Sequence, residues 1–287
     1  MLFRSQKARL TTSEFYSPHY HIGAEKIILR DTTLRDAAGG AAAPVTGEYE
    51  LRDATFNVQG LPLAYWPYLK GRYEQTETML RSFRTGYSDD RGVYVETVFK
   101  LFEALGVAPP PGWDGTLKLD YYSERGPAIG IDLDYETENY FGLLRTYYVH
   151  DQGEDNLGPY RDNTPSTEHR GRVLWRHRHY LPNDWEITLE TAFVSDPGFL
   201  EEWERSEYFE GKDQETAVYL KRARDTEAIT LLANWRTLEF ETQTEHLPDL
   251  TYRRIGDILG PVVSYSEARV GTVRYRPDDR RFIDDGR

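Results

Sequence analysis

The sequence predicts an all-β protein, and three observations support this prediction. From about residue 79, apolar and polar residues alternate with a period of two in segments of roughly 8–12 residues, as in strands with one apolar and one polar face. Turn-forming residues separate these segments, for example Gly126-Pro127 and Pro182-Asn183-Asp184. The chain of 287 residues contains 21 tyrosines, 12 phenylalanines and 6 tryptophans, far too many for a disordered chain.

Residues 1–59 are predicted to form short strands joined by turns. The segments "KARLTTSEFYS" and "YHIGAEKIILRD" alternate in part, and "DAAGGAAAPVTGEY" is predicted to be a loop from its Gly, Ala and Pro content. The next segment, "YELRDATFNVQG", is predicted to be another strand. It is expected to place Leu51, Asp53, Thr55 and Asn57 on one face and Arg52, Ala54, Phe56 and Val58 on the other.

A stretch without charged residues, "LPLAYWPYL", follows. It contains the aromatic residues Tyr65, Trp66 and Tyr68 and two prolines, Pro62 and Pro67. Because proline cannot donate a hydrogen bond to a sheet ladder, it is confined to edges, bulges and strand starts. The stretch is therefore interpreted as a junction with weakened strand pairing, which acts either as a rigid linker or as a place where two β-structures part.

The clearest strands come after residue 117. The segment "AIGIDLDYE" places Asp132, Asp134 and Glu136 opposite a row of apolar residues, and "WEITLETAFV" separates Glu186 and Glu190 from its apolar residues in the same way. Less regular members of the class are "TLKLDYYS", "YFGLLRTYYVHD", "GRVLWRHRHYL", "TAVYLKRA", "EAITLLANW" and "TLEFETQTE".

One segment, "SDPGFLEEWERSEYF", is predicted to be a short helix in a loop between strands. Ser195 or Asp196 is suited to cap it, and Pro197 stands at a first-turn position. Apolar residues then follow at helical spacing. No second helix is predicted.

The alternation fits either a soluble β-sandwich or a membrane barrel. The segments after residue 117 are longer than the usual strand of about 5–6 residues and match the roughly 9–11 residues of a membrane-crossing strand. Their polar faces are strongly ionic, as a water-filled lumen requires. Composition and periodicity thus favour antiparallel transmembrane β-barrel strands, whose lumen Asp132, Asp134, Glu136, Glu186 and Glu190 would face.

Charge and cysteine content narrow the function. The net charge is −13, made up of +1 in residues 1–70 and −14 in residues 71–287, which argues against a nucleic-acid partner. The absence of cysteine excludes disulfides, thiolate zinc sites and cysteine nucleophiles within these residues. No apolar run is long enough for a transmembrane helix, and the first residues lack the apolar region of a signal peptide.

Three short patterns could carry chemistry, and each has a simpler interpretation. Asp132 and Asp134 share a face, as a metal site or a glycosidase pair requires, but they fit a row of lumen-facing acids. His177 and His179 share a face without a third ligand nearby in the sequence, and the pair in "PHYH" fits a strand surface. No nucleophile-elbow, phosphate-loop or zinc-protease motif occurs. We therefore predict no catalytic residue, no metal and no cofactor.

The junction stretch resembles the segment that joins the periplasmic domain to the barrel in the LptD (OstA) family of outer-membrane lipopolysaccharide-assembly proteins, where the pattern is roughly V-P-x-F-Y-x-P-Y. A second similar segment is "GWDGTLKLDYYSERGPAIGIDLDYE", whose matching residues are Asp114, Tyr122, Arg125, Gly126 and Tyr135. The segments "FVSDPGFLEEW" and "SPHYHIGAEKIIL" also resemble parts of this family. The resemblance covers most of residues 15–255.

By this resemblance, residues 1–69 are the end of an OstA-like periplasmic β-domain with its junction, and residues 70–287 are the first part of an outer-membrane barrel. The chain is expected to be a fragment, because family members begin with a signal peptide and have many more strands. The family's further proline after the junction is absent from "RSFRTGYS", and its paired cysteines are missing. The tail "RYRPDDRRFIDDGR" is expected to lie outside the barrel.

The resemblance implies a non-enzymatic function at the cell outer membrane, with a part in the periplasm. The expected activity is transport of lipopolysaccharide and its insertion into the outer leaflet. Expected partners are lipopolysaccharide, a plug lipoprotein, a periplasmic bridge protein and outer-membrane lipids. Pro62, Pro67, Tyr65, Trp66 and Tyr68 would form the junction and a candidate lateral gate near the bilayer surface. The alternative is a soluble, secreted β-sandwich protein that binds or hydrolyses carbohydrate.

Overall fold

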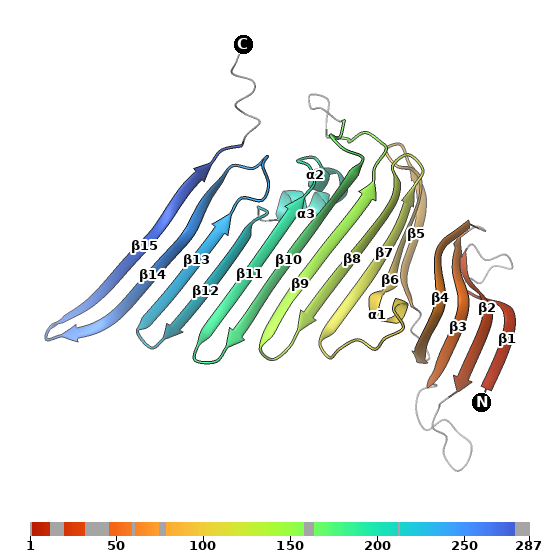
Figure 1. The fold of residues 1–287 in the computed structure, drawn as a ribbon, viewed down its shortest axis with the longest axis horizontal. Helices are drawn as coiled ribbons and strands as arrows, with labels where there is room; N and C mark the ends of the chain where they lie inside the picture. The colour runs from red at the N-terminus through yellow and green to blue at the C-terminus, as the bar shows by residue number, and fades with distance from the viewer. Residues whose placement is uncertain are drawn as a thin grey trace, which may run out of the picture. The chain divides into compact units, whose positions relative to one another are not determined.

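The computed structural model describes residues 2–11, 20–31, 46–58, 61–74, 79–157, 164–211 and 213–278. Nearly all regular structure in these residues is β-structure, arranged in a four-stranded and an eleven-stranded sheet (Figure 1). Every strand pair whose register is described is antiparallel. The predicted all-β class is confirmed. Within the described part of the chain, no helix is both long and apolar enough to cross a membrane.

The four-stranded sheet contains the first four strands in chain order. These strands are β1 (Leu2–Leu10), β2 (Tyr20–Asp31), β3 (Thr46–Val58) and β4 (Leu61–Glu74). In this order β4 is an edge strand, paired with β3. The predicted domain boundary after residue 69 falls inside β4 and stays a prediction.

One row of residues interrupts the ladder at the same level in all four strands. Lys7, Glu25, Asp53 and Pro67 occupy matching register positions, and the ladder pairs lie on both sides of them but not at them. Lys7 and Asp53 have positive φ angles of 53° and 49°. We call these four residues the break row. Because no ladder pair forms there, the missing N–H of Pro67 removes no pairing of β4 with β3.

The break row also changes which residues face the core. In β3 the buried residues Leu51 and Ala54 lie three positions apart, and both belong to one core cluster with Phe56. The predicted arrangement, with Leu51 on the face of Asp53 and opposite to Ala54, is therefore wrong. The positive φ of Asp53 reverses the alternation between these residues, and a pattern of period two cannot show such a reversal.

Aromatic rings fill this core. Phe56 and Phe99 are 1% and 0% exposed, and their rings meet edge to face with centroids 5.2 Å apart. Trp66 of β4 approaches the Phe99 ring at 5.9 Å. Phe99 belongs to β6, so residues from β3, β4 and β6 share one core.

The eleven-stranded sheet follows chain order, so neighbouring strands are joined consecutively. In the described residues it is open, with β5 and β15 as its edge strands. Its strands are β5 (Leu80–Ser88), β6 (Gly92–Lys100), β7 (Trp113–Tyr122), β8 (Gly126–Glu136), β9 (Tyr140–His150), β10 (His169–Leu181), β11 (Trp185–Val194), β12 (Thr216–Arg224), β13 (Glu227–Trp235), β14 (Gln243–Leu259) and β15 (Val262–Arg276).

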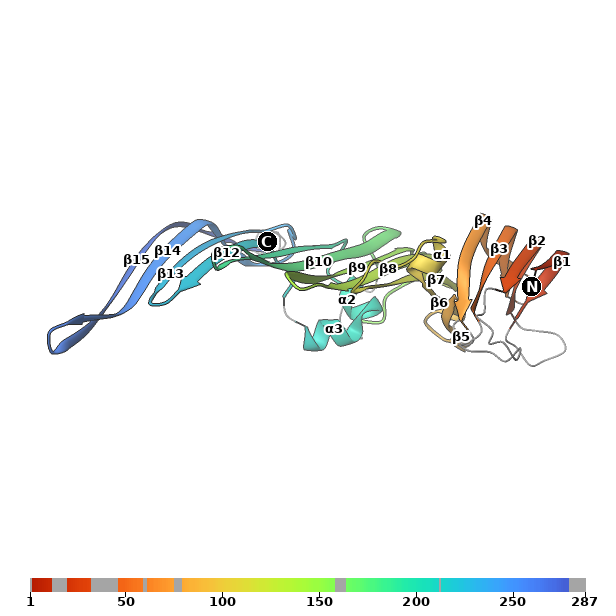
Figure 2. The ribbon, with the colours of Figure 1, turned by 90° about the horizontal axis from the view of Figure 1, so that it is seen from below.

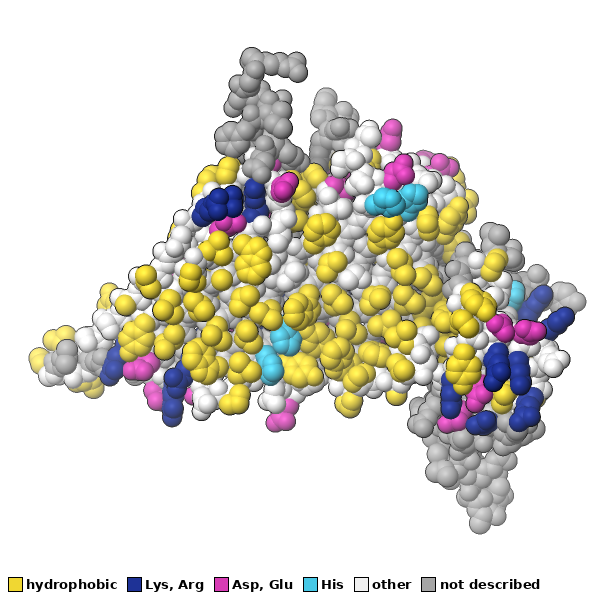
Figure 3. Space-filling view, viewed as in Figure 1, with side chains coloured by type: hydrophobic (Ala, Val, Ile, Leu, Met, Phe, Trp, Pro, Cys, Tyr) yellow, Lys and Arg dark blue, Asp and Glu magenta, His cyan; other side chains and the backbone are white. Residues whose placement is uncertain are grey.

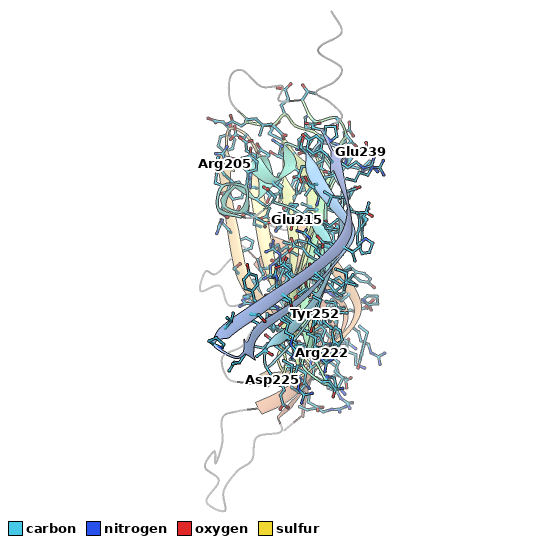
Figure 4. All side chains as sticks on the ribbon, turned by 90° about the vertical axis from the view of Figure 1, so that its left-hand side faces the viewer. Arg205, Glu215, Arg222, Asp225, Glu239 and Tyr252 are labelled. Atoms are coloured by element: carbon cyan, nitrogen blue, oxygen red, sulfur yellow. The ribbon has the colours of Figure 1, made fainter. Side chains whose placement is uncertain are left out.

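From β8 onward the two ends of this sheet differ in their connections. One end, the short-turn end, has tight turns of two or three residues after β8, β10, β12 and β14. The other, the long-loop end, has longer connections after β9, β11 and β13. Figure 4 shows Asp225, from a tight turn, at one end and Arg205 and Glu239, from two long connections, at the other. Consecutive antiparallel strands place alternate connections at opposite ends in this way.

The connection after β11 is helical, as predicted, but it contains two short helices instead of the single predicted one. They are α2 (Phe199–Trp203) and α3 (Arg205–Glu210), and Figure 2 shows both on the same side of the sheet. Gly198, rather than Ser195 or Asp196, occupies the N-cap position, but the Asp196 carboxylate accepts a hydrogen bond from the Gly198 N–H at 3.1 Å. The four-residue helix α1 (Leu101–Ala104) was not predicted, because one turn is too short to show a helical period.

One prediction near the C-terminal part of the sheet is wrong, and the prediction for the tail is wrong for residues 274–276, whereas residues 279–287 lie outside the described part of the chain. Most of "TLEFETQTE" lies outside strands, since β14 begins only at Gln243. The tail begins inside a strand, because β15 extends to Arg276 and Arg276 pairs with Gln243. An ion pair of 3.2 Å between Arg276 and Glu245 supports this pairing, which a polar composition alone does not reveal.

Candidate functional site: the two faces of the eleven-stranded sheet

One face of the sheet is apolar and exposed. Cross-strand pairs place Ile129 beside Tyr148, and Val173 beside Phe193, on this face. Ile129, Val173 and Phe193 are 45%, 40% and 53% exposed. Figure 3 shows apolar side chains spread across this side of the sheet. We call it the apolar face. A continuous exposed apolar surface of this kind marks contact with a protein or a membrane.

The opposite face carries the predicted acids together with basic partners. Asp132, Asp134 and Glu136 alternate with the apolar-face residues of β8, and Glu186 and Glu190 do the same in β11. We call this side the charged face. The structure therefore brings all five predicted acids to one face. That this face lines a lumen stays a prediction.

Ion pairs link the strands across the charged face. Asp134 pairs with Arg145 of β9 at 2.7 Å, and Glu190 pairs with Arg176 of β10 at 3.3 Å. Glu186 lies between two basic residues and approaches the Arg178 guanidinium at 3.3 Å. Acids that share a face with bases in neighbouring strands have the pattern of cross-strand charge pairs, which stabilise sheets modestly.

The helices α2 and α3 lie against the charged face near the long-loop end. Arg172 of β10, which is on this face beside Tyr147, forms an ion pair of 3.1 Å with Glu204 and another with Glu207. Glu204 directly precedes α3, and Glu207 lies within it. Buried Arg172 thus holds the helical connection against the sheet.

A buried ion cluster lies at the long-loop end, and no pattern in the sequence predicts it. The cluster consists of Arg125, Asp151, Asp155, Arg170 and Asp196. Both arginines are fully buried and bind the same Asp151 carboxylate, Arg125 Nε at 2.6 Å and Arg170 Nη1 at 2.8 Å. The five residues come from the turn after β7, the connection after β9, the start of β10 and the connection after β11. The cluster therefore joins several connections into one unit.

Neighbouring charge keeps Asp151 and Arg125 ionised. Burial alone would raise the pKa of Asp151, but hydrogen bonds and positive charge from Arg125 outweigh it, so the pKa lies below its usual range. Burial alone would lower the pKa of Arg125, but Asp151, Glu202 and Asp155 raise it. A buried charge of this kind is tolerated only while its partners remain.

The sequence shows where each residue of this cluster stands relative to the predicted strands and turns, but not that the residues meet. Arg125 directly precedes the predicted turn Gly126-Pro127, and Arg170 directly precedes the predicted strand "GRVLWRHRHYL". Arg125 and Asp155 are separated by 30 positions in the chain. Without a known register, nothing in the sequence shows that they meet.

The predicted junction residues lie in β4, the edge strand of the four-stranded sheet. Tyr65 is 58% exposed and donates a hydrogen bond to the Asp53 carboxylate at 2.6 Å, and Tyr68 is also exposed. Trp66 points to the opposite side and packs on the Phe99 ring. Pro62 pairs with Asn57, and Pro67 belongs to the break row. A role in lateral opening stays a prediction.

The histidines considered as metal ligands lie among aromatic rings. His177 and His179 are on the apolar face, with ring centroids 5.8 Å apart, and Tyr135 Oη lies 2.9 Å from His177 Nδ1. Within the described ranges, no group of three or more His, Cys, Asp or Glu residues is arranged to hold a metal ion. His21 lies in β2, whereas His19 falls outside the described residues.

Comparison with known proteins identifies relatives of the chain, although no family model matches it. The LPS-assembly protein LptD of Actinobacillus pleuropneumoniae serotype 7 (strain AP76) is 29% identical over 169 residues, which is 57% of this chain. LptD of Pseudoalteromonas atlantica is 25% identical over 210 residues, or 72% of the chain, and LptD of Haemophilus ducreyi is 26% identical over 161 residues, or 56%. This chain is related to the LptD family.

The relationship confirms the family predicted from the junction stretch and the three further segments that resemble it. The matches cover 20%, 25% and 19% of the three LptD relatives, so the chain spans a fifth to a quarter of their length. An all-β structure with one exposed apolar face agrees with this LptD relationship.

Proposed function

We propose that the chain acts in the transport of lipopolysaccharide and its insertion into the outer leaflet of the outer membrane, as part of an LPS-assembly translocon. In this proposal the eleven-stranded sheet crosses the membrane, with its apolar face toward lipid and its charged face toward a water-filled lumen. The observation that carries the proposal is the segregation of exposed apolar residues and paired charges onto opposite faces, in a relative of LptD.

Strand length supports membrane crossing. All eleven strands of the sheet contain at least nine residues, and β8 and β9 contain 11 each. A strand of 11 residues is about 36 Å long, and a tilt near 45° leaves a span of about 26 Å across the bilayer. This matches the apolar band of about 25 Å in outer-membrane barrels.

From β8 onward, the unequal connections support an orientation, although residues 101–112 between β6 and β7 form a longer connection at the short-turn end. Outer-membrane barrels have short periplasmic turns and longer extracellular loops. The short-turn end would therefore face the periplasm, and the ion cluster would lie at the cell surface. Strand β5 begins at the short-turn end, so the chain enters the sheet from the periplasmic side. This direction agrees with the proposal that residues 1–69 are the end of a periplasmic β-domain and its junction.

The two faces suit the two parts of lipopolysaccharide. Its acyl chains need an apolar surface, and its sugar head group needs a polar passage. The four-stranded sheet, with its aromatic core, would carry the acyl chains, and the charged face would accommodate the sugars. A plug lipoprotein inside the barrel and a periplasmic bridge protein are the partners this function requires. No covalent step is involved.

A soluble sandwich that binds or hydrolyses carbohydrate fits less well. Such a protein buries the apolar face of each sheet against another sheet. Here Phe193 and Val270 are 53% and 69% exposed on the apolar face. Their exposure favours lipid contact.

Photo-crosslinking from neighbouring residues tests the proposal. Thr188 and Leu189 are adjacent in β11 but lie on the charged and the apolar face, respectively. A photoreactive residue at position 188 should give adducts with lipopolysaccharide in Gram-negative cells that express the full chain. The same group at position 189, the matched control, should give adducts with membrane lipid and few with lipopolysaccharide. Equal lipopolysaccharide adducts from both positions, or none from position 188, would contradict the proposed path.

A further inference from the structure

A cluster of rings ends the apolar face at the short-turn end. Its members are Trp113, Tyr135, Tyr140, Trp175 and His177, and we call it the ring cluster. Trp113 stacks on Tyr135 with centroids 4.7 Å apart, and Tyr140 lies 5.8 Å from the His177 ring. Trp175 and His177 stack at 5.8 Å. These residues come from four consecutive strands, β7 to β10.

Hydrogen bonds in the ring cluster determine which ring nitrogen of neutral His177 carries the proton. Trp175 Nε1 donates to the Tyr135 hydroxyl oxygen at 3.0 Å, because an indole nitrogen is a donor only. Tyr135 is 7% exposed, and among the described residues His177 Nδ1, 2.9 Å away, is the acceptor within hydrogen-bond distance of its hydroxyl. Tyr135 therefore donates to Nδ1, and neutral His177 carries its proton on Nε2. The apolar face thus presents an N–H donor at this end.

A second group of rings lies at the other end of the same strands. Tyr148 stacks with His169 at 6.2 Å, and His169 stacks with His150 at 5.0 Å. Tyr140 and Tyr148 are on the same face of β9, eight positions apart, which is about 26 Å along a strand. The apolar face is thus bordered at both ends by rings with polar atoms, at a separation comparable to a membrane's apolar band.

The surroundings of His177 favour a negatively charged acceptor. On the neighbouring strand β11, the residues beside His177 and His179 are Leu189 and Ile187, and the acids of β8 and β11 lie on the charged face. Arg222 of β12, two strands from His177, stands at the same end of the sheet (Figure 4); its Nε donates to the Asn183 carbonyl oxygen at 3.2 Å, and its guanidinium lies 5.8 Å from the Trp185 ring centroid. A donor, a basic side chain and interfacial aromatic rings together match a lipid phosphate.

We propose that the ring cluster binds the phosphate of a phospholipid headgroup in the periplasmic leaflet, through the Nε2–H of His177. Tyr135 is a positioning residue, because its hydroxyl selects the tautomer that presents this donor. The inference rests on the proposed function, in which the eleven-stranded sheet crosses the membrane with its short-turn end toward the periplasm. It assigns a lipid contact to particular atoms of that sheet.

Histidine NMR tests the proposal on the full chain in dodecyl maltoside micelles, with ¹⁵N-labelled histidine. His177 should show the Nε2–H tautomer, and its signals should shift in a saturable way on addition of dihexanoyl-phosphatidylglycerol. Dihexanoylglycerol, which lacks the phosphate, should cause no such shift. Tyr135→Phe should remove the single tautomer and raise the half-saturating lipid concentration at least threefold. Tyr147→Phe, which removes a hydroxyl on the charged face that lies 3.3 Å from Tyr122 Oη, is the matched control and should change neither.

Two results would overturn the inference. One is an equal shift with the phosphate-free lipid, and the other is a Tyr135→Phe variant that behaves as its control does. Lipid contact measured at a spin label on Phe193→Cys shows whether such a result contradicts the phosphate site alone or the proposed function as well. Lipid contact at the label without a response of His177 contradicts the phosphate site alone. No lipid contact at the label contradicts both proposals.

Discussion

Arg170 and Asp196 form a two-point ion pair in the interior of the long-loop end. The guanidinium Nε and Nη2 donate to the two carboxylate oxygens at 2.9 Å and 2.8 Å. Arg170 is 0% exposed and Asp196 is 6% exposed, and they lie 26 positions apart in the chain. The pair thus joins the start of β10 to the connection after β11. It belongs to the ion cluster, whose removal should lower the free energy of unfolding.

Replacing the arginine of this pair should destabilise the protein strongly. Arg170→Met leaves Asp155 and Asp196 buried without their main positive partner, and we expect the free energy of unfolding to fall by about 3–5 kcal/mol. Urea denaturation followed by tryptophan fluorescence measures this loss. The matched control is Arg254→Met, whose ion pair with Glu227 is about half exposed and should be worth less than about 1 kcal/mol. Equal losses in both variants would contradict the role of the cluster.

The ion cluster should also make stability depend on acid pH. The pKa of Asp151 is lower in the folded protein than its usual value, so its stabilising effect is complete above the unfolded-state pKa, near 3.9. It is lost as pH falls through the lower folded-state pKa. We therefore expect the stability difference between the native chain and Asp151→Asn to be largest at pH 7 and to narrow below about pH 4. A difference that stays constant from pH 7 to pH 3 would show that the charge of Asp151 is not responsible.

Glu241, in the connection after β13, should give the opposite pH dependence to Asp151. Its ionisation should lower the stability of the folded protein as pH rises. Burial, with added repulsion from Asp213 and Glu215, raises its pKa to about 6. Because the folded-state pKa is raised, protonation favours the folded protein, and this contribution is lost as pH rises through about 6. Glu241→Gln should therefore stabilise the chain at pH 7, by about 1 kcal/mol after allowance for solvent screening. Thermal unfolding at pH 7 and pH 4.5 checks this, since the variant should gain nothing at the lower pH.

Replacing Pro67 tests two things separately: whether the proline is needed for stability, and whether it helps the two β-structures to part. Because Pro67 lies in the break row, Pro67→Ala should leave the free energy of unfolding within about 1 kcal/mol of the native value. If the prolines act as a gate, the restored N–H should still slow the release of lipopolysaccharide. Unfolding in urea and a lipopolysaccharide-delivery assay measure the two effects separately. Unchanged delivery in this variant would remove the gate hypothesis and leave a rigid junction.

The strand faces of the large sheet could be predicted because each strand has one apolar and one polar face. In β8 and β11 the period of two places Asp132, Asp134, Glu186 and Glu190 on the side that the structure shows. Where the backbone leaves regular β-geometry, the same rule fails. Asp53 has a positive φ, so Leu51 faces the core instead of the polar side. No residue type in "YELRDATFNVQG" marks that reversal.

The ion cluster and the proton position of His177 were beyond prediction for a different reason. Arg125 and Arg170 meet only because several connections converge at one end of the sheet, and this depends on the register of every strand between them. The tautomer of His177 depends on Trp175 and Tyr135, which belong to β10 and β8, two strands separated by β9. Sequence spacing shows which face a residue takes, but not which residues across the sheet it touches.

The accessibility of spin labels on the two faces tests most directly whether the eleven-stranded sheet separates lipid from water. The chain has no cysteine, so Phe193→Cys on the apolar face and Thr188→Cys on the charged face each give a single label site. In phospholipid vesicles, the label at position 193 should collide mainly with dissolved oxygen, which concentrates in lipid. The label at position 188 should collide mainly with a water-soluble nickel complex. Equal access of the nickel complex to both labels would contradict a sheet that separates lipid from water.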